Sequence, residues 1–245
     1  MKTLFIIMLA VTITGIIMSC QESGARGIEP VPEKGQVSGK AVDATGKPLQ
    51  NVDILLSHTV WSDKKITAKT DQDGNYSVTL PAEPRGNWTI KATHHTAAYG
   101  NRYDFVLDAD DNRSFGGTRG AIRNFTWKML GEHIGGQYGA EVEVYSDRAD
   151  LPLQEVKLIF SPVEDLLVDG SEAKTLEKTL ERIDGQYRAA YIPVGKYAVQ
   201  AVYKGKALKL SGHRNAENST ESMEVSFRED DASAPAAFKA VLVIQ

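Results

Sequence analysis

Short segments in which apolar and polar residues alternate, separated by tight-turn sequences, are the feature that most restricts how this chain can fold. In "KKITAKTDQDGNYSVTLP", residues 64–81, apolar side chains occupy alternate positions on both sides of Asp73-Gly74. A repeat of two residues places successive side chains on opposite faces of a strand, and glycine supplies the positive φ that a tight hairpin turn requires. The following "GNWTIKATHH" alternates in the same way, with Trp88 on the apolar side. These segments predict an all-β chain.

The same arrangement occurs a second time. Residues 70–95 contain Asp-Gly-x-Tyr, then a proline, then Gly-x-aromatic and an alternating segment, and residues 183–203, "IDGQYRAAYIPVGKYAVQAVY", contain these parts in the same order. Just before the second copy, Leu176 and Leu180 stand four residues apart, which fits a short helix. The same stretch also alternates, and its counterpart in the first copy is a predicted strand, so we predict a strand here too. The chain is therefore expected to use one β unit twice.

The start of the chain is typical of an exported lipoprotein. "MKTLFIIMLAVTITGIIMSC" has a lysine, an apolar run too short to span a membrane and a small residue before Cys20, the single cysteine. "IMSC" resembles a bacterial lipobox, in which the cysteine is acylated and the signal is cut; the alternative is an ordinary secretory signal with an incidental cysteine. We predict a lipoprotein signal peptide at 1–19, a flexible tether at 20–34, and attachment to the bacterial cell envelope, at the outer membrane, through lipid on Cys20. A lone cysteine permits no internal disulfide.

The first copy also carries a family resemblance. "GQVSGKAVDATGKPLQNVDILL", followed by "TAKTDQDGNYSVTLP" and "GNWTIKATHH", resembles the carboxypeptidase regulatory-like, or transthyretin-like, β-sandwich domain. In the second copy "DRADLPLQEVKLIF" keeps the Pro-Leu and the strand after it. The resemblance implies two tandem transthyretin-like or immunoglobulin-like sandwiches without catalytic activity, at 35–96 and 136–245. Residues 97–135 are expected to form an ordered connector, with Trp88 and Trp127 in the core.

Sequence patterns for catalysis and metal binding are missing. A zinc carboxypeptidase needs a His-x-x-Glu step, and no histidine of the chain has glutamate three residues on. The chain contains no Gly-x-Ser-x-Gly elbow and no Walker loop. Asp108, Asp110 and Asn112 alternate as in a calcium loop, but Arg113 and Arg119 stand where an EF-hand needs glycine and glutamate, which leaves only a looser calcium site open. We predict no catalytic residue, metal or cofactor, and the net charge of −4 argues against a nucleic-acid partner.

Five residues are candidates for ligand binding: Trp61, His94, His95, Tyr99 and Tyr103. Flat rings stack on the apolar faces of pyranosides. Trp61 is expected in a loop, and the adjacent histidines on opposite faces of a strand end; the alternatives are a packed loop residue and a plain polar strand end. The leading hypothesis is a lipid-anchored envelope protein that binds or scaffolds, with an extracellular glycan or an envelope protein as partner. The alternatives are a periplasmic assembly factor that pairs through an exposed strand edge and a metal-assisted hydrolase.

Overall fold

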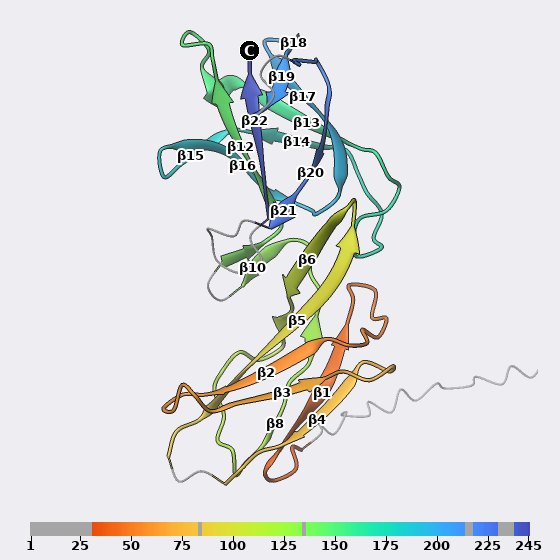
Figure 1. Ribbon diagram of the computed structural model, residues 1–245, viewed down its shortest axis with the longest axis vertical. Helices are drawn as coiled ribbons and strands as arrows, with labels where there is room; N and C mark the ends of the chain where they lie inside the picture. The colour runs from red at the N-terminus through yellow and green to blue at the C-terminus, as the bar shows by residue number, and fades with distance from the viewer. Residues whose placement is uncertain (1–30, 83–84, 134–135, 214–217, 230–237) are drawn as a thin grey trace, which may run out of the picture. The chain divides into compact units, whose positions relative to one another are not determined.

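The computed structural model describes residues 31–82, 85–133, 136–213, 218–229 and 238–245 (Figure 1). Apart from a 3-10 turn at Leu153–Glu155, the regular structure in these ranges is β-strand, so the all-β prediction is confirmed. In the described ranges no helix has the length and apolar character needed to cross a membrane. The expected signal peptide, Cys20 and the tether up to Pro30 lie outside the described residues.

The first sandwich has one sheet in the order β4-β1-β9-β7, with β8 also paired to β1, and a second sheet in the order β3-β2-β5-β6. Alternate residues of each strand face inward, as Ile54 and Leu56 of β2 do, and are fully buried. The strands are β1 (Gln36–Val42), β2 (Asp53–His58), β3 (Lys65–Lys69), β4 (Asn75–Thr79), β5 (Trp88–Ala98), β6 (Asn101–Val106), β7 (Asp108–Ala109), β8 (Ala121–Ile122) and β9 (Phe125–Thr126).

The second sandwich follows a short hairpin of β10 (Gly131–His133) and β11 (Gly136–Tyr138). One sheet has the order β15-β16-β12-β22-β19, with β21 on β22, and the other has the order β14-β13-β17-β18, with β20 on β17. The strands are β12 (Ala140–Ser146), β13 (Lys157–Pro162), β14 (Leu176–Thr179), β15 (Glu181–Ile183), β16 (Gln186–Ile192), β17 (Lys196–Tyr203), β18 (Lys206–Leu208), β19 (Leu210–Gly212), β20 (Met223–Ser226), β21 (Arg228–Glu229) and β22 (Phe238–Ile244).

Strand pairing repeats from one sandwich to the other. β1 pairs antiparallel with β4 and parallel with β8 and β9, as β12 pairs antiparallel with β16 and parallel with β22. β2 lies between β3 and β5, and β13 lies between β14 and β17. The prediction of two tandem sandwiches is confirmed. The range 97–135, expected as an ordered connector, supplies β6 to β9 to the sheets of the first sandwich, because β5 turns back into β6 and the chain then returns beside β1.

One of the two predicted hairpins is confirmed. Asp184 and Gly185 have φ values of 50° and 85° between the paired strands β15 and β16, as a two-residue hairpin turn requires. Gly74 has the expected positive φ of 75°, but the hairpin prediction at Asp73-Gly74 is wrong: the turn crosses between sheets, because β3 pairs with β2 and β4 pairs with β1. The stretch that also fitted a short helix forms β14 and β15, so the strand prediction is confirmed.

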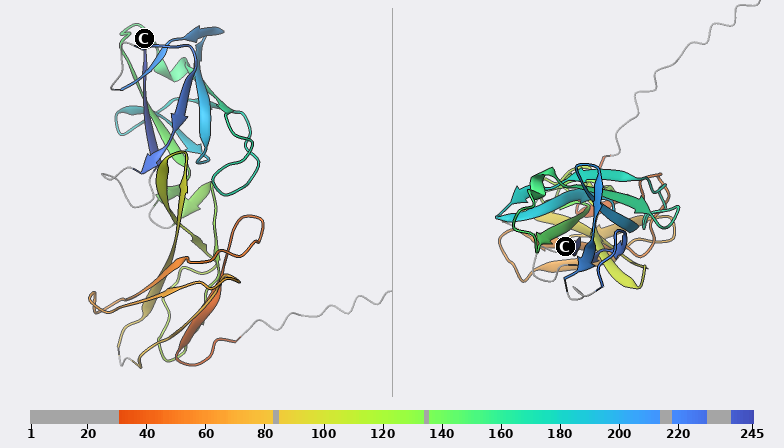
Figure 2. Two further views of the ribbon diagram at one scale, coloured as in Figure 1. Left: turned by 45° about the vertical axis from the view of Figure 1, so that its right-hand side comes forward. Right: turned by 90° about the horizontal axis from the view of Figure 1, so that it is seen from above.

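The hairpin of β5 and β6 joins the two sandwiches (Figure 2). The Tyr103 hydroxyl donates to the Phe227 carbonyl at 3.0 Å, and both side chains are fully buried. The rings of Tyr103 and Phe105 lie 5.5 and 4.8 Å from that of Phe238 in the last strand. The buried apolar residues of both sandwiches form one continuous core, in which Trp127 lies as predicted.

Candidate functional site

A hollow of about 740 Å³ lies on the outer face of β3, β2, β5 and β6 and is here called the His95 hollow. Its lining combines two lysines, two aspartates, two threonines and one histidine with a few apolar residues. The lining residues are Asp53, Ile54, Leu55, Thr67, Ala68, Lys69, Lys91, Thr93, His95 and Asp104.

Strand register explains why these polar side chains meet. Asp53 of β2 lies opposite Lys69 of β3 on one side and Thr93 of β5 on the other. His95 of β5 lies opposite Asp104 of β6. Residues opposite each other in antiparallel strands place their side chains on the same face, so positions far apart in sequence share the outer surface.

His95 lies between two carboxylates. Its Nδ1 is 2.6 Å from Asp104 Oδ1 and its Nε2 is 3.0 Å from Asp53 Oδ2. An ionised carboxylate only accepts hydrogen bonds, so both bonds form together only when both ring nitrogens carry a proton. Neither nitrogen is left to accept a proton from a hydroxyl nucleophile. The arrangement orders three strands and presents charge, but it lacks the geometry of a nucleophile–base pair.

Lys69 is the main electrostatic partner of Asp53. Its ammonium hydrogen-bonds the carboxylate and is the largest cause of the lowered pKa of Asp53; burial opposes this effect, and the bond from His95 adds to it. Both side chains of the Lys69–Asp53 pair are about half exposed. Solvent screening therefore limits the pair to about 1 kcal/mol of stability or less.

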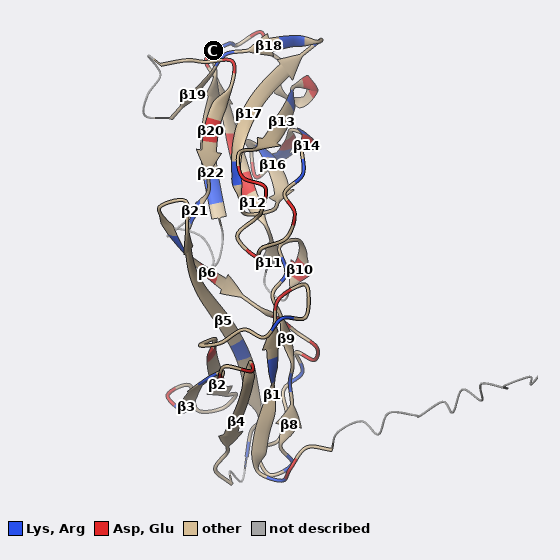
Figure 3. Ribbon diagram, turned by 90° about the vertical axis from the view of Figure 1, so that its right-hand side faces the viewer, with Lys and Arg blue, Asp and Glu red and all other residues tan. Residues whose placement is uncertain are grey.

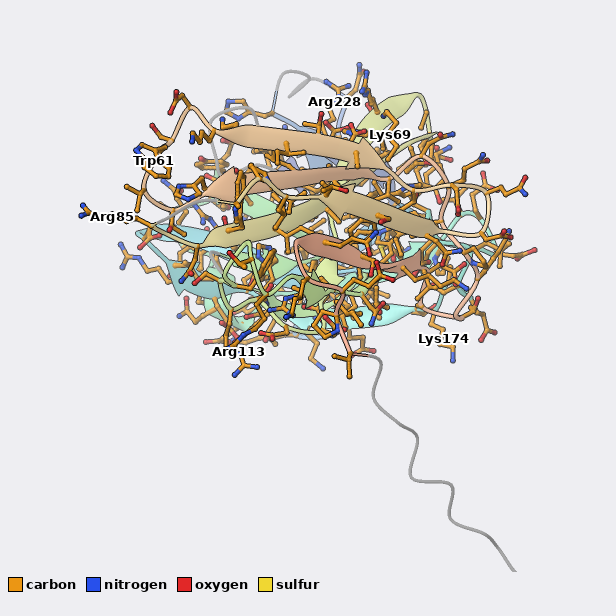
Figure 4. The ribbon with its side chains drawn as sticks, turned by 90° about the horizontal axis from the view of Figure 1, so that it is seen from below. Trp61, Lys69, Arg85, Arg113, Lys174 and Arg228 are labelled. Carbon is orange, nitrogen blue, oxygen red and sulfur yellow. The ribbon has the colours of Figure 1, made fainter. Side chains whose placement is uncertain are left out.

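Trp61 lies in the loop after β2, as expected, but its ring is largely occupied. The indole stacks on the His58 imidazole with centroids 4.5 Å apart, and Lys64 Nζ lies 4.3 Å from the indole centroid. A pyranose would have to displace one of these groups to stack there. His58 is opposite Trp88, and His95 is seven residues further along β5, so about 23 Å of strand separates Trp88 from His95 at the usual rise per residue; Trp61 is not among the residues that line the hollow. Figure 4 likewise shows Trp61 well separated from Lys69.

The other three candidate residues point elsewhere. His94 faces the interior, as expected for the neighbour of His95; its ring lies 4.7 Å from that of Trp127, and burial lowers its pKa. Tyr103 is fully buried and cannot receive a ligand in this structure. Tyr99 donates a hydrogen bond to a carbonyl of the second sandwich, that of Leu166, at 3.2 Å. Of the five predicted residues, only His95 lines the hollow.

Sequence reasoning did not select the charged residues beside His95. Lys69 and Lys91 occupy alternating polar positions of predicted strands, and such positions are usually solvated surface. Asp53 and Asp104 are separated by 51 residues and meet only because β5 lies between β2 and β6. Alternation could identify each as outward-facing, but only the register identifies them as neighbours.

Carboxylates of the 108–112 loop are engaged by cations. Asp108 forms an ion pair with Lys128, and Asp111 is hydrogen-bonded by Arg113, the largest cause of its low pKa of about 2. Over the part of the chain that the structure describes, no three His, Cys, Asp or Glu side chains are grouped to hold a metal ion.

Comparison with models of protein families gave no match, and none of the curated proteins matched. Among solved structures, the chain is similar to the Bacillus anthracis TIE protein, with 16% identity and a TM-score of 0.31 over 86% of this chain and 34% of that one. The chain thus spans about a third of that protein. A single B repeat unit of the collagen-binding surface protein of Staphylococcus aureus gives 14% identity and a TM-score of 0.25 over 86% and 98%. The pilus adhesin SpaC from Lactobacillus rhamnosus GG gives 11% identity and a TM-score of 0.29, over 87% of this chain and 29% of that one. Similarity at this level assigns no activity or partner to this chain.

Proposed function

We propose that this chain is a non-catalytic binding or scaffolding protein of the bacterial cell envelope, anchored by lipid on Cys20. The observation that carries the proposal is that the two sandwiches pack against each other and share one hydrophobic core. The hairpin of β5 and β6 buries Tyr103 and Phe105 against the second sandwich, so the aromatic residues nearest the candidate histidines serve packing. A joined pair of sandwiches with a polar outer face suits presentation and binding.

The chemistry of the described residues supports the non-catalytic part of the proposal. His95 is the histidine held most closely by carboxylates, and both of its nitrogens are engaged. His94 packs on Trp127, and His58 accepts hydrogen bonds from two loop amides. The envelope part of the proposal rests on the lipobox-like "IMSC" and the apolar run before it. Kinship with the carboxypeptidase regulatory-like domains is likewise proposed from the motifs of the first copy.

Two measurements on bacteria that express the full chain test the proposal. The native chain is expected in the membrane fraction and Cys20→Ser in the soluble fraction, because acylation requires the thiol. Protease added to intact cells, with a periplasmic protein as control, then shows which face of the membrane carries the sandwiches. Membrane retention of Cys20→Ser would refute anchoring by lipid at Cys20.

The edge of β4 favours a second candidate, an assembly role through strand addition. Leu80 N donates to Gly35 O beside β1, and the residues of β4 that bond β1 alternate with residues that do not. The backbone N–H and C=O groups of Ser77 and Thr79, one and three residues before Leu80, therefore point away from β1. Asn75–Thr79 contains no charged residue or proline, the usual devices that block pairing at an edge. In the second sandwich the corresponding strand, β16, is covered by β15. An extended strand of a partner protein, antiparallel to β4, would complete the first sheet in the same way.

Photo-crosslinking in cells tests this second candidate. A benzophenone amino acid at Ser77 is expected to capture a discrete partner, while the same group at Lys65, on the charged edge strand β3, captures none. Equal products from both positions, or dimers of the chain itself at Ser77, would argue against a partner strand on β4.

A further inference from the structure

Opposite charges alternate in and beside the His95 hollow. Lys69 pairs with Asp53, His95 lies between Asp53 and Asp104, and Arg102 Nε lies 3.6 Å from Asp104 Oδ1. In Figure 3 basic and acidic segments likewise intermingle over both sandwiches. Each carboxylate therefore already has a cationic partner, so a charged ligand would have to displace an existing pair. A ligand without net charge can bind without breaking these pairs.

Several polar groups of the hollow remain available to a ligand. The side chains of Lys91, Thr67 and Thr93 make no hydrogen bond to any other described residue, although all three line the hollow. The carboxylate of Asp104 meets His95 through Oδ1, which leaves Oδ2 to accept further bonds. Donors and acceptors therefore alternate over short distances on one surface.

The floor of the hollow is apolar. Leu55 lies at its centre, opposite Thr67 on one side and Lys91 on the other, and is half-buried. The aliphatic stems of the lysines extend this apolar area while their charged ends stay in water. Such a floor can contact carbon-bound hydrogens while the polar groups around it engage hydroxyls.

We propose that the His95 hollow binds a neutral polyhydroxylated ligand, a saccharide chain, with Asp104 accepting from vicinal hydroxyls and Lys91 and Thr93 donating to ring or hydroxyl oxygens. This inference rests on the proposed binding function and names the ligand class of that site. The Asp53–His95–Asp104 bridge holds β2, β5 and β6 in register, which fixes the spacing of the groups that contact the ligand. The hollow is open and its lining contains no Trp, Tyr or Phe, so a single site binds a saccharide weakly. Several copies of the chain on one membrane would raise the overall avidity for a long saccharide chain.

Titration calorimetry on the lipidated full chain in detergent micelles tests the inference. The neutral probes are maltohexaose, xylohexaose and mannohexaose, with trigalacturonate and spermine as charged comparators. At least one neutral hexasaccharide is expected to bind, and Lys91→Ala and Asp104→Asn should each weaken it by about tenfold, the effect of one charge-assisted hydrogen bond. Lys65→Ala is the matched control, because Lys65 lies on the outward face of β3 but outside the lining, and its affinity should stay at the native value.

Three results would overturn the inference: no neutral probe binds, only a charged probe binds, or Lys91→Ala and Asp104→Asn bind as tightly as the native chain. Thr93→Val keeps the shape of the side chain and removes its hydroxyl, so it separates loss of a ligand contact from loss of folding. Far-ultraviolet circular dichroism and the melting temperature of each variant complete that check. Failure here leaves the envelope proposal standing, since that proposal is tested independently by fractionation of Cys20→Ser.

Discussion

The Tyr103 hydroxyl makes the cooperation between the two sandwiches testable. It donates to the Phe227 carbonyl at 3.0 Å, and both residues are 0% exposed. Tyr103→Phe keeps the ring contacts with Phe105 and Phe238 but leaves a buried carbonyl without this donor. Such a loss costs about 1–2 kcal/mol of unfolding free energy. In a domain of this size that corresponds to a fall in melting temperature of about 2–8 °C.

Two matched variants remove a hydroxyl-to-carbonyl hydrogen bond of the same kind, but inside one sandwich instead of between the two. The Tyr76 hydroxyl donates to Arg123 O at 2.8 Å inside the first sandwich, and the Tyr197 hydroxyl donates to Pro193 O at 3.0 Å inside the second. Each phenylalanine variant therefore removes one hydroxyl-to-carbonyl bond. If the sandwiches unfold as one cooperative unit, all three variants shift the same transition.

Urea unfolding followed by two probes provides the assay. All three tryptophans, Trp61, Trp88 and Trp127, lie in or beside the first sandwich, so their fluorescence reports on that half. Far-ultraviolet circular dichroism reports strands in both halves. Coincident transitions, and a joint shift to lower urea in Tyr103→Phe, are expected. Separate transitions, or a Tyr103→Phe variant within about 0.3 kcal/mol of the native chain, would refute the reasoning.

Two further predictions concern the backbone of β1 and the charges of the hollow. A Cβ on Gly39 would lie 1.7 Å from Arg123 O, so Gly39→Ala should cost about 3 kcal/mol in urea unfolding, whereas Gly116→Ala, with no atom closer than 3.9 Å, should cost far less. Because the pKa of Asp53 is lowered in the folded state, its contribution to stability is present above its ordinary value and is lost as the pH falls through the folded value. Lys69→Met should reduce that acid-dependent loss and raise the Asp53 pKa in a carbon-13 NMR titration; an unchanged pKa would contradict the assignment of Lys69 as its main cause.

Local pattern was sufficient to predict β1 to β5 of the first copy and β12 to β17 of the second, but not β6, β20 or β22. Alternation identified the inner faces of β2, β4 and β5, and Asp73-Gly74 and Asp184-Gly185 marked the turns. Trp88 and Trp127 lie in the core because each falls on the apolar side of its segment. These features depend on neighbours a few residues away, which a sequence shows directly.

The pairing of strands that are far apart in the chain could not be predicted from local sequence pattern. β8 and β9 pair in parallel with β1, more than 80 residues earlier in the chain, and nothing local in "GAIRNFTWK" indicates that partner. The polar pair His94-His95 also looked like a strand end. β5 instead continues to Ala98, because its inward-facing residues meet β6 and the second sandwich beyond the edge of β2. The sequence alone does not show whether a strand ends with its first neighbouring strand or extends beyond it to pair with a second one.

The aromatic residues near His95 illustrate how this difference alters a functional interpretation. In the sequence, Tyr99 and Tyr103 follow the two histidines closely and suggest one ligand-binding cluster. The hairpin separates them: Tyr103 is directed into the joint between the sandwiches, Tyr99 contacts Leu166, and His95 is directed to the outer face. Because inward and outward positions alternate along β5 and β6, residues that stack inside the joint cannot also line the hollow. Any ligand of this face must therefore be recognised by carboxylates, ammonium groups and hydroxyls. These polar groups of the hollow, and not the number of aromatic rings near His95 in the sequence, identify the class of ligand to test.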